Sequence, residues 1–316
     1  MNETAISGRK LIVASAVLLL AVLFPHFAPY TALASEILIF ALFAMAYDLV
    51  LGYSGMLSFG HAAFFGLGAY TTGIFILRVY PSILAALLAG MVISALGACL
   101  VGFLSIRRRG IYFTLITLAF AQMFYFIAFK WTGLTGGDDG LQGVPRPSIG
   151  SLDLTSEMTL YYFILLCVFL SVLIGIRVVN SPFGKTLQAI RENRDRAMSI
   201  GYNVDRFKLI VFVISGLFSG LAGGLYALLL NFVPLGSLHW TISGEVVIMS
   251  IVGGMGTLFG PMLGAIGIIL LEDIISNFTD CWSFIMGLLF MASVLGFRGG
   301  IMGIIRRKKP AVSRTS

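Results

Sequence analysis

The sequence predicts an all-α integral membrane protein with about ten transmembrane helices, some of them short or broken. Hydrophobic residues make up 58% of the 316 residues and charged residues only 11%, whereas a soluble domain carries about 25% charged residues. The mean hydropathy is +0.98. Apolar runs recur that are long enough to cross a bilayer core of about 30 Å, which needs roughly 20 residues. Basic residues gather in a few of the connections between these runs, as in loops that stay in the cytoplasm.

The apolar runs follow one another along the chain. Spans are expected over residues 32–51, 61–77, 83–106, 111–129, 159–176 and 207–230, with a shorter one over 11–24. The segment 245–275 is too long for one span and is interrupted by glycines, so we expect two short spans joined near Gly256 and a last span over 282–297. A cleaved signal peptide is the alternative for the first run, but its candidate cleavage site at Ala34 lies well beyond the apolar residues.

The distribution of Lys and Arg predicts the orientation. With the N-terminus inside and ten crossings, the basic clusters at 107–109, 177–208 and 298–314 all face the cytoplasm, as does the C-terminus. Only Arg78, Lys130 and Arg146 of the 21 basic residues then lie outside. The chain is expected to form a single membrane domain over residues 1–316, with an exterior loop at 131–158 and an interior loop at 180–206.

Motifs of enzymes and metal sites are absent from the sequence. It contains neither a GxxxxGK[ST] phosphate loop nor an HExxH pair, and Cys99, Cys167 and Cys281 share no short spacing. The net charge of +7 fits basic cytoplasmic loops rather than a nucleic-acid partner. We therefore expect no catalytic residue, no metal and no cofactor, and uphill transport would take its energy from another chain.

The interior loop contains a short, charged helix. Pro182 is suited to the start of a helix, a helical pattern continues from Phe183 to Ile200, and Gly201 is a stop signal. An apolar side is formed by Leu187, Ile190, Met198 and Ile200. The helix is either a solvated connector or an amphipathic element that docks a soluble partner.

Glycines interrupt two hydrophobic segments at comparable places. The first interruption contains Gly52, Gly55, Gly60, Gly66 and Gly68, with Ser58 and His61 as further candidates beside them, and the second contains Gly253, Gly254, Gly256, Gly260 and Gly264. Such paired interruptions indicate a substrate path, because unwound backbone at membrane depth persists only where it is buried or lines a cavity. Close packing of helices is the competing explanation for any single glycine.

Ionisable residues near the apolar runs are few. They are Glu36, Asp48, His61, Glu245, Glu272 and Asp273. Most lie close to the end of a predicted span, and Asp48, the deepest, is expected to reach the interface. The absence of a row of acids at mid-membrane disfavours a stand-alone secondary transporter, and an integral-membrane enzyme would need a cluster of His, Asp or Glu that is not evident.

Several stretches together resemble the LivM-type permeases of bacterial branched-chain amino acid ABC importers. They are the SPFG run at 181–184, REN at 191–193, Ala197 with Gly201, GLAG at 220–223, GYSGMLSFGHAAFFGLGAY at 52–70, TGGDDGLQGVP at 135–145 and GGMGTLFGPMLG at 253–264. The resemblance covers most of the chain from about residue 35 to 300. It implies a type II importer-like permease in the bacterial inner membrane.

The resemblance also implies that the interior helix is the coupling helix, which inserts into a cleft of an ATP-binding subunit. Its candidate residues are Pro182, Gly184, Arg191, Glu192, Asp195, Ala197 and Gly201. Against the EAAxxxG motif common in such permeases, Asp195 is a shortened acid and Arg196 departs from the small residue. If the helix continues to Gly201, Ala197 and Gly201 share a face and leave a notch for the partner, flanked by Arg191 and Glu192.

The implied partners are a second, homologous permease forming a heterodimer, two cytoplasmic ATP-binding subunits, a periplasmic substrate-binding protein and the lipid bilayer. The implied substrates are leucine, isoleucine and valine, and the exterior loop is then periplasmic. Relatives in the same family use urea, short amides or other amino acids, and these remain alternatives.

Overall fold

The computed structural model describes residues 30–148 and 153–279, together with Pro25 and isolated positions between 284 and 302. Its helices in chain order are α2 Thr31–Ser54, α3 His61–Arg78, α4 Ile83–Ser105, α5 Ile111–Lys130, α6 Thr132–Thr135, η2 Gly137–Asp139, α7 Glu157–Asn180, α8 Pro182–Glu192, α9 Arg194–Ser199, α10 Val204–Leu230, η3 Leu235–Leu238, α11 Trp240–Gly253 and α12 Phe259–Ser276. Extended pairing within the described ranges is limited to one bridge between Leu141 and Val233. Six of the helices are long and apolar enough to cross a membrane. The predicted all-α membrane class is confirmed.

The predicted spans between residues 32 and 275 correspond to helices. The segment 245–275 is split, as expected, into α11 and α12. The short helix α11 has 14 residues and is about 21 Å long at 1.5 Å per residue, less than the bilayer core. The predicted first and last spans, over 11–24 and 282–297, fall outside the continuously described residues.

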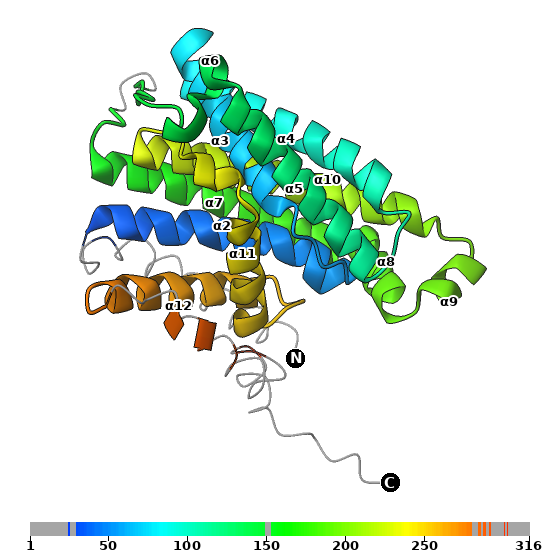
Figure 1. Cartoon of the computed structure of the whole chain (residues 1–316). Helices are drawn as coiled ribbons and strands as arrows, with labels where there is room; N and C mark the ends of the chain where they lie inside the picture. Colours follow the sequence, from blue (N-terminus) through cyan, green and yellow to red (C-terminus); the bar gives the residue numbers. More distant parts are fainter. Residues whose placement is uncertain are drawn as a thin grey trace.

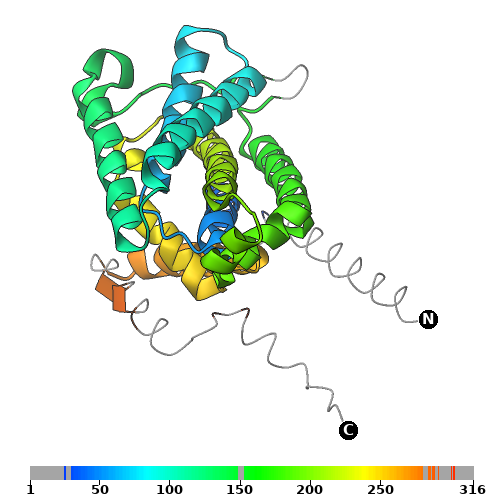
Figure 2. The ribbon, with the colours of Figure 1, turned by 90° about the vertical axis from the view of Figure 1, so that its right-hand side faces the viewer.

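Helix α2 is the centre of the bundle. In the most apolar stretch of α2, 89% of the residues are buried, whereas the value is 22% for the corresponding stretches of α5 and α7. The reason is that α2 packs against α7, α10, α11 and α12 at once, and Figure 2 shows α2 and α10 between α5 and α7. The outer helices keep large apolar side chains such as Leu115, Phe126 and Leu166 exposed, which suits a lipid surface or a membrane partner.

Glycines bring α3 and α10 into close contact. A Cβ atom at Gly68 would collide with the backbone of Gly220, and one at Gly223 would collide with the carbonyl of Phe65. Small residues at such crossings allow helix backbones to approach within a membrane. Close helix packing therefore accounts for Gly68 and Gly223.

The bundle has two distinct ends. Helices α8 and α9 project from one end, and α6 with the segment 131–148 lies at the other (Figure 1). We call these the α8–α9 end and the loop end. Helix α11 runs steeply across the direction of α12 in Figure 1, and the turn between them lies toward the α8–α9 end.

Candidate functional site

The predicted interior helix is two helices. Ser181 caps α8, its side chain accepting from the backbone N–H of Gly184 at 3.3 Å, and Pro182 occupies the first turn. The break occurs at Asn193, which has an extended backbone and accepts from the N–H of Arg196 at 2.9 Å. The prediction of a single helix from Phe183 to Ile200 is therefore wrong, because the Asn side chain caps a new helix.

The connection between α7 and α8 depends on Gly184. This glycine is buried, and a Cβ atom there would collide with the carbonyl oxygen of Val179. The α8 helix can therefore turn tightly away from the end of the long helix α7. Pro182, Glu192 and Asp195 remain exposed on the same unit.

The predicted notch between Ala197 and Gly201 does not form, since α9 ends at Ser199. Ala197 is 3% exposed and packs in a small cluster with Ile190 and Val204. Gly201 has φ +95°, and a Cβ atom placed on it would have no neighbour within 4 Å. The helix stop predicted at Gly201 is confirmed, and this residue lies on the solvent-exposed surface of the unit.

The apolar residues of the α8–α9 unit fall into two sets. Leu187 and Ile190 are 1% and 2% exposed and anchor α8 to the bundle. Met198, Ile200 and Tyr202 are 40%, 68% and 42% exposed. We call these last three the apolar tip.

Arg191 connects the α8–α9 unit to the glycine-rich interruptions. Its guanidinium donates a hydrogen bond to the carbonyl of Gly52 at the end of α2. A Cβ atom at Gly55 would lie 3.2 Å from Arg191 Cγ, and one at Gly256 would lie 3.0 Å from Nη1. The guanidinium therefore points back toward the membrane helices, although the residue is exposed, and its place beside a partner contact stays a prediction.

The two interruptions meet at Asp48. This residue is completely buried, and its carboxylate accepts hydrogen bonds from the backbone N–H of Gly256 at 2.7 Å and of Leu258 at 3.1 Å. Gly52 lies directly between them, because a Cβ atom there would collide with the Asp48 carboxylate and with the Gly256 nitrogen. The protein itself encloses Asp48, and backbone donors from the turn satisfy its carboxylate there, while its expected position near the interface stays a prediction. We call Asp48, Gly52, Gly256 and Arg191 the junction.

The other glycines of the second interruption hold α11 against α12. A Cβ atom at Gly253 would collide with the carbonyl of Gly260. Gly254 has φ +110°, which only glycine adopts readily, and its carbonyl accepts from the Thr257 hydroxyl at 2.7 Å. The turn is thus both tight and internally bonded.

Ser58 and His61 lie beside Tyr47 rather than at the junction, and Gly60 packs against Thr117. His61 is completely buried, with ring nitrogens 3.0 Å from Ser58 Oγ and 3.0 Å from Ser215 Oγ. The Tyr47 hydroxyl donates to the carbonyl of Ser58 at 3.1 Å. These contacts form a buried polar connection between α2, α3 and α10, and in this conformation the three candidates are enclosed by the chain itself.

Three acids that are far apart in the sequence converge. Glu36 of α2, Glu245 of α11 and Glu272 of α12 lie within electrostatic reach of the Tyr226 hydroxyl, and Glu245 lies within reach of both other carboxylates. No spacing in the sequence signals this, because each acid comes from a different helix. Their proximity weakens the argument from sequence against an ion-coupled transporter.

The comparison with known families decides the class. A family model described as branched-chain amino acid transport system / permease component matches residues 30–294. The chain belongs to this family of permease components. The match spans every helix that the structure describes continuously, from α2 to α12, and the predicted family is confirmed.

The names of similar proteins refer to more than one transported substrate. The high-affinity branched-chain amino acid transport system permease protein LivM of Salmonella typhimurium is 28% identical over 87% of this chain and 70% of its own length. The protein of the same name from Escherichia coli is 27% identical over the same shares. An autoinducer 2 import system permease protein, LsrC of Yersinia pseudotuberculosis, is 28% identical over 77% of this chain and 69% of its own. No solved structure matches the chain.

Proposed function

We propose that the permease is the membrane-spanning subunit of an ABC importer for leucine, isoleucine and valine, receiving its substrate from a periplasmic binding protein. It pairs with a second, homologous permease as a heterodimer and with two cytoplasmic ATPase subunits in the bacterial inner membrane. The permease itself carries no hydrolytic chemistry. The substrate assignment rests on the two LivM relatives, which cover more of the chain than the autoinducer 2 permease does.

The observation that carries the proposal is that one side of the α8–α9 unit is exposed while the other contacts the membrane helices. The apolar tip is exposed and suits a cleft in a soluble partner. The same unit contacts both interrupted segments through Arg191. An ion-coupled transporter has no need of such a unit, and this favours the importer even though three acids converge on Tyr226.

The mechanism follows from the contact between Arg191 and the interrupted segments. Closure of the ATPases on ATP moves the α8–α9 unit, and Arg191 transmits the displacement to Gly52 at the end of α2. Asp48 passes it to the turn between α11 and α12. Two segments that line the path then shift together between outward-open and inward-open states.

A charge placed at Gly201 is expected to release the ATPases. Gly201→Asp and Gly201→Asn have nearly the same shape, and both residues tolerate a left-handed backbone better than most. Only Asp places a negative charge next to the apolar tip, where it is desolvated on docking. The Asp variant should lose ATPase subunits on detergent extraction, or hydrolyse ATP without stimulation by the loaded binding protein, whereas the Asn variant should behave as the unmodified protein. Equal subunit ratios and stimulation in both would identify the unit as a solvated connector.

The proposed orientation is open to labelling with a membrane-impermeant thiol reagent. In a variant lacking the native cysteines, Asp138→Cys at the loop end should react from outside intact cells, and Arg196→Cys on α9 should not. Both positions are exposed, so access by the reagent depends on the side of the membrane. If only the Arg196→Cys variant is labelled, the proposed orientation is wrong and the α8–α9 end faces the outside.

A further inference from the structure

Basic side chains from three separate elements gather at the α8–α9 end. Arg109 follows α4, Lys208 belongs to the second turn of α10, and Arg194 begins α9. Arg109 and Arg194 both lie within electrostatic reach of Lys208, as does the carboxylate of Asp205. Figure 1 shows the connection between α4 and α5 at this end of the bundle. We call Arg109, Arg194 and Lys208 the basic patch.

Packing between α4 and α10 brings two members of the patch together. A Cβ atom at Gly102 would lie only 2.9 Å from the side chains of Leu209 and Phe212, so the last turn of α4 lies against the first turns of α10. The α4 helix ends at Ser105, and the exposed arginines at 107–109 follow at once. They therefore emerge next to the residues that precede Leu209.

The basic patch has more positive charge than the protein neutralises. The ion pair found in the described part of the chain joins Arg194 Nη2 to Asp205 Oδ1 at 2.9 Å. The other two guanidinium nitrogens of Arg194, Nε and Nη1, are enclosed and have no hydrogen-bond partner among the described residues. Arg109 and Lys208 form no ion pair within the same ranges. One carboxylate thus faces three cations, which repel one another and favour the binding of a further anion.

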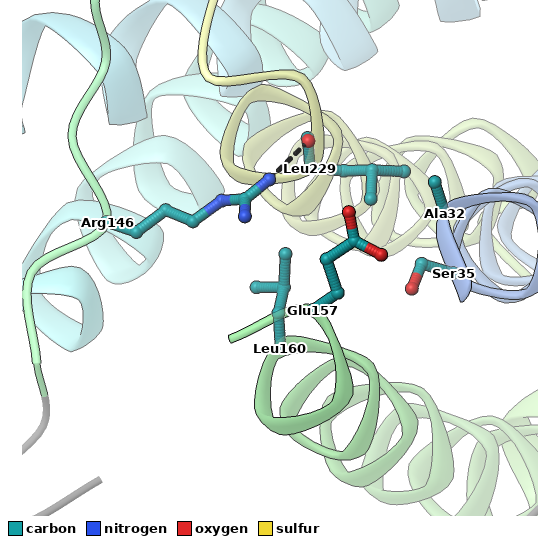
Figure 3. Close-up of a pocket in the computed structure, with 6 residues that line it drawn as sticks. All are labelled: Ala32, Ser35, Arg146, Glu157, Leu160 and Leu229. Atoms are coloured by element: carbon teal, nitrogen blue, oxygen red, sulfur yellow. Dashed lines mark hydrogen bonds between the residues drawn. The ribbon is translucent and has the colours of Figure 1, made fainter. Parts of the chain in front are cut away.

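The arginines of the loop end, in contrast, have partners within the protein. Arg146 donates from Nε to the carbonyl of Leu228 at 2.7 Å and from a terminal nitrogen to that of Leu229 at 2.6 Å, and Figure 3 shows the second of these bonds. Arg78 donates to the carbonyl of Gly133 at 2.8 Å. Carbonyl oxygens satisfy these guanidinium groups, so the need for an external anion is specific to the α8–α9 end.

Exposed apolar side chains flank the basic patch. Phe103 and Leu104 lie in the last turn of α4, and Ile210 lies two residues after Lys208 on α10. Tyr112 in the first turn of α5 is exposed as well, and Tyr is enriched where a bilayer meets water. A ligand with an anionic group next to hydrocarbon chains matches both parts of this surface. An acidic phospholipid has that arrangement.

We propose that the basic patch binds the headgroup of an anionic phospholipid, whose acyl chains lie against the apolar side chains of α4 and α10. Arg109 is exposed and Lys208 is half-buried, so both can contact the lipid phosphate. The enclosed nitrogens of Arg194 act on it through their charge. The inference requires neither the substrate nor the ATPases of the proposed function, so the two proposals can fail separately.

Two lipids with the same acyl chains test the assignment. The purified permease, with the subunits that copurify with it, is incubated in detergent with equal amounts of dioctanoyl phosphatidylglycerol and dioctanoyl phosphatidylcholine. Bound lipids are counted by native mass spectrometry. The anionic lipid should be retained at least about tenfold more, because each Lys or Arg near an anionic lipid surface contributes about fivefold. A double variant, Arg109→Gln with Lys208→Gln, should retain both lipids equally.

Two control variants separate charge from folding. Arg78→Gln with Lys130→Gln removes one arginine and one lysine that are exposed at the loop end, and it should keep the full preference. Arg109→Lys with Lys208→Arg keeps both charges of the patch. It should keep the preference as well, which shows that the loss in the double Gln variant is not a folding defect. Glycerol 3-phosphate in excess should displace no lipid, because it lacks the acyl chains.

Three results would overturn the lipid site. The first is equal retention of the two lipids by the unmodified permease, and the second is a preference that survives in the double Gln variant. If that variant also releases the ATPase subunits, the basic patch is a contact for the ATPase. The third is displacement of the lipid by glycerol 3-phosphate, which identifies a site for soluble phosphate esters.

Discussion

Arg191→Gln should reduce substrate transport by roughly ten- to a hundredfold while the ATPase subunits stay bound. The Arg191 guanidinium is the contact between the α8–α9 unit and the carbonyl of Gly52. A hydrogen bond from a charged donor contributes about 1.5–3 kcal/mol, and losing it removes that much coupling free energy between ATP hydrolysis and the membrane helices. ATP hydrolysis should continue at its basal rate and lose its response to the loaded binding protein. Transport and hydrolysis are measured in the same proteoliposomes.

Arg194→Gln is the matched control for this experiment. Arg194 lies three residues further along and pairs with Asp205 at 2.9 Å; the Arg194 side chain is 18% exposed and that of Asp205 is 52% exposed. Because solvent reaches the carboxylate, the pair is worth about 0–1 kcal/mol, and transport should change less than about threefold. If Arg191→Gln transports as well as Arg194→Gln, the junction does not transmit the movement of α8 and α9.

Asp48→Asn should destabilise the folded permease strongly. The Asp48 carboxylate accepts from two backbone N–H groups, and an Asn side chain can present its oxygen to only one of them. The other N–H then faces an amide donor inside the protein. Leaving such a group unsatisfied costs about 1–3 kcal/mol, and more where the lost partner was charged. The thermal unfolding midpoint in detergent should fall by several degrees.

Asp139→Asn provides the comparison for Asp48→Asn. Asp139 is exposed at the loop end, so the same chemical change there should leave the midpoint within about one degree, as is usual for surface substitutions. Should both variants unfold at the same temperature, the Asp48 contacts contribute nothing to holding the two interruptions together.

Local signals in the sequence are sufficient to predict much of the fold. Hydropathy places α2, α3, α4, α5, α7 and α10, and glycines mark the turn that separates α11 from α12. These features depend on residues close together in the chain, so periodicity and composition reveal them. The break at Asn193 is not predicted, because an Asn inside a helical pattern and an Asn that caps a new helix have the same neighbours.

Long-range contacts cannot be predicted in the same way. The sequence singles out Arg191 and Gly52, but nothing in either segment indicates that they meet across 139 positions. Ala197 is expected to be exposed if the helix continues, whereas its burial depends on packing against Val204 beyond the turn. Glu36, Glu245 and Glu272 converge only when α2, α11 and α12 are assembled.

The burial of Asp48 has a consequence for biosynthesis. Its donors, Gly256 and Leu258, are 208 and 210 residues later in the chain. At about 5–20 residues per second, the ribosome needs roughly 10–40 s to reach them. During that interval the Asp48 carboxylate lacks the backbone donors that satisfy it in the finished fold, and burying it without partners is costly. Asp48 therefore needs water or another polar partner until the turn between α11 and α12 has been made, and the contacts of the central helix with these two helices are among the last that it acquires.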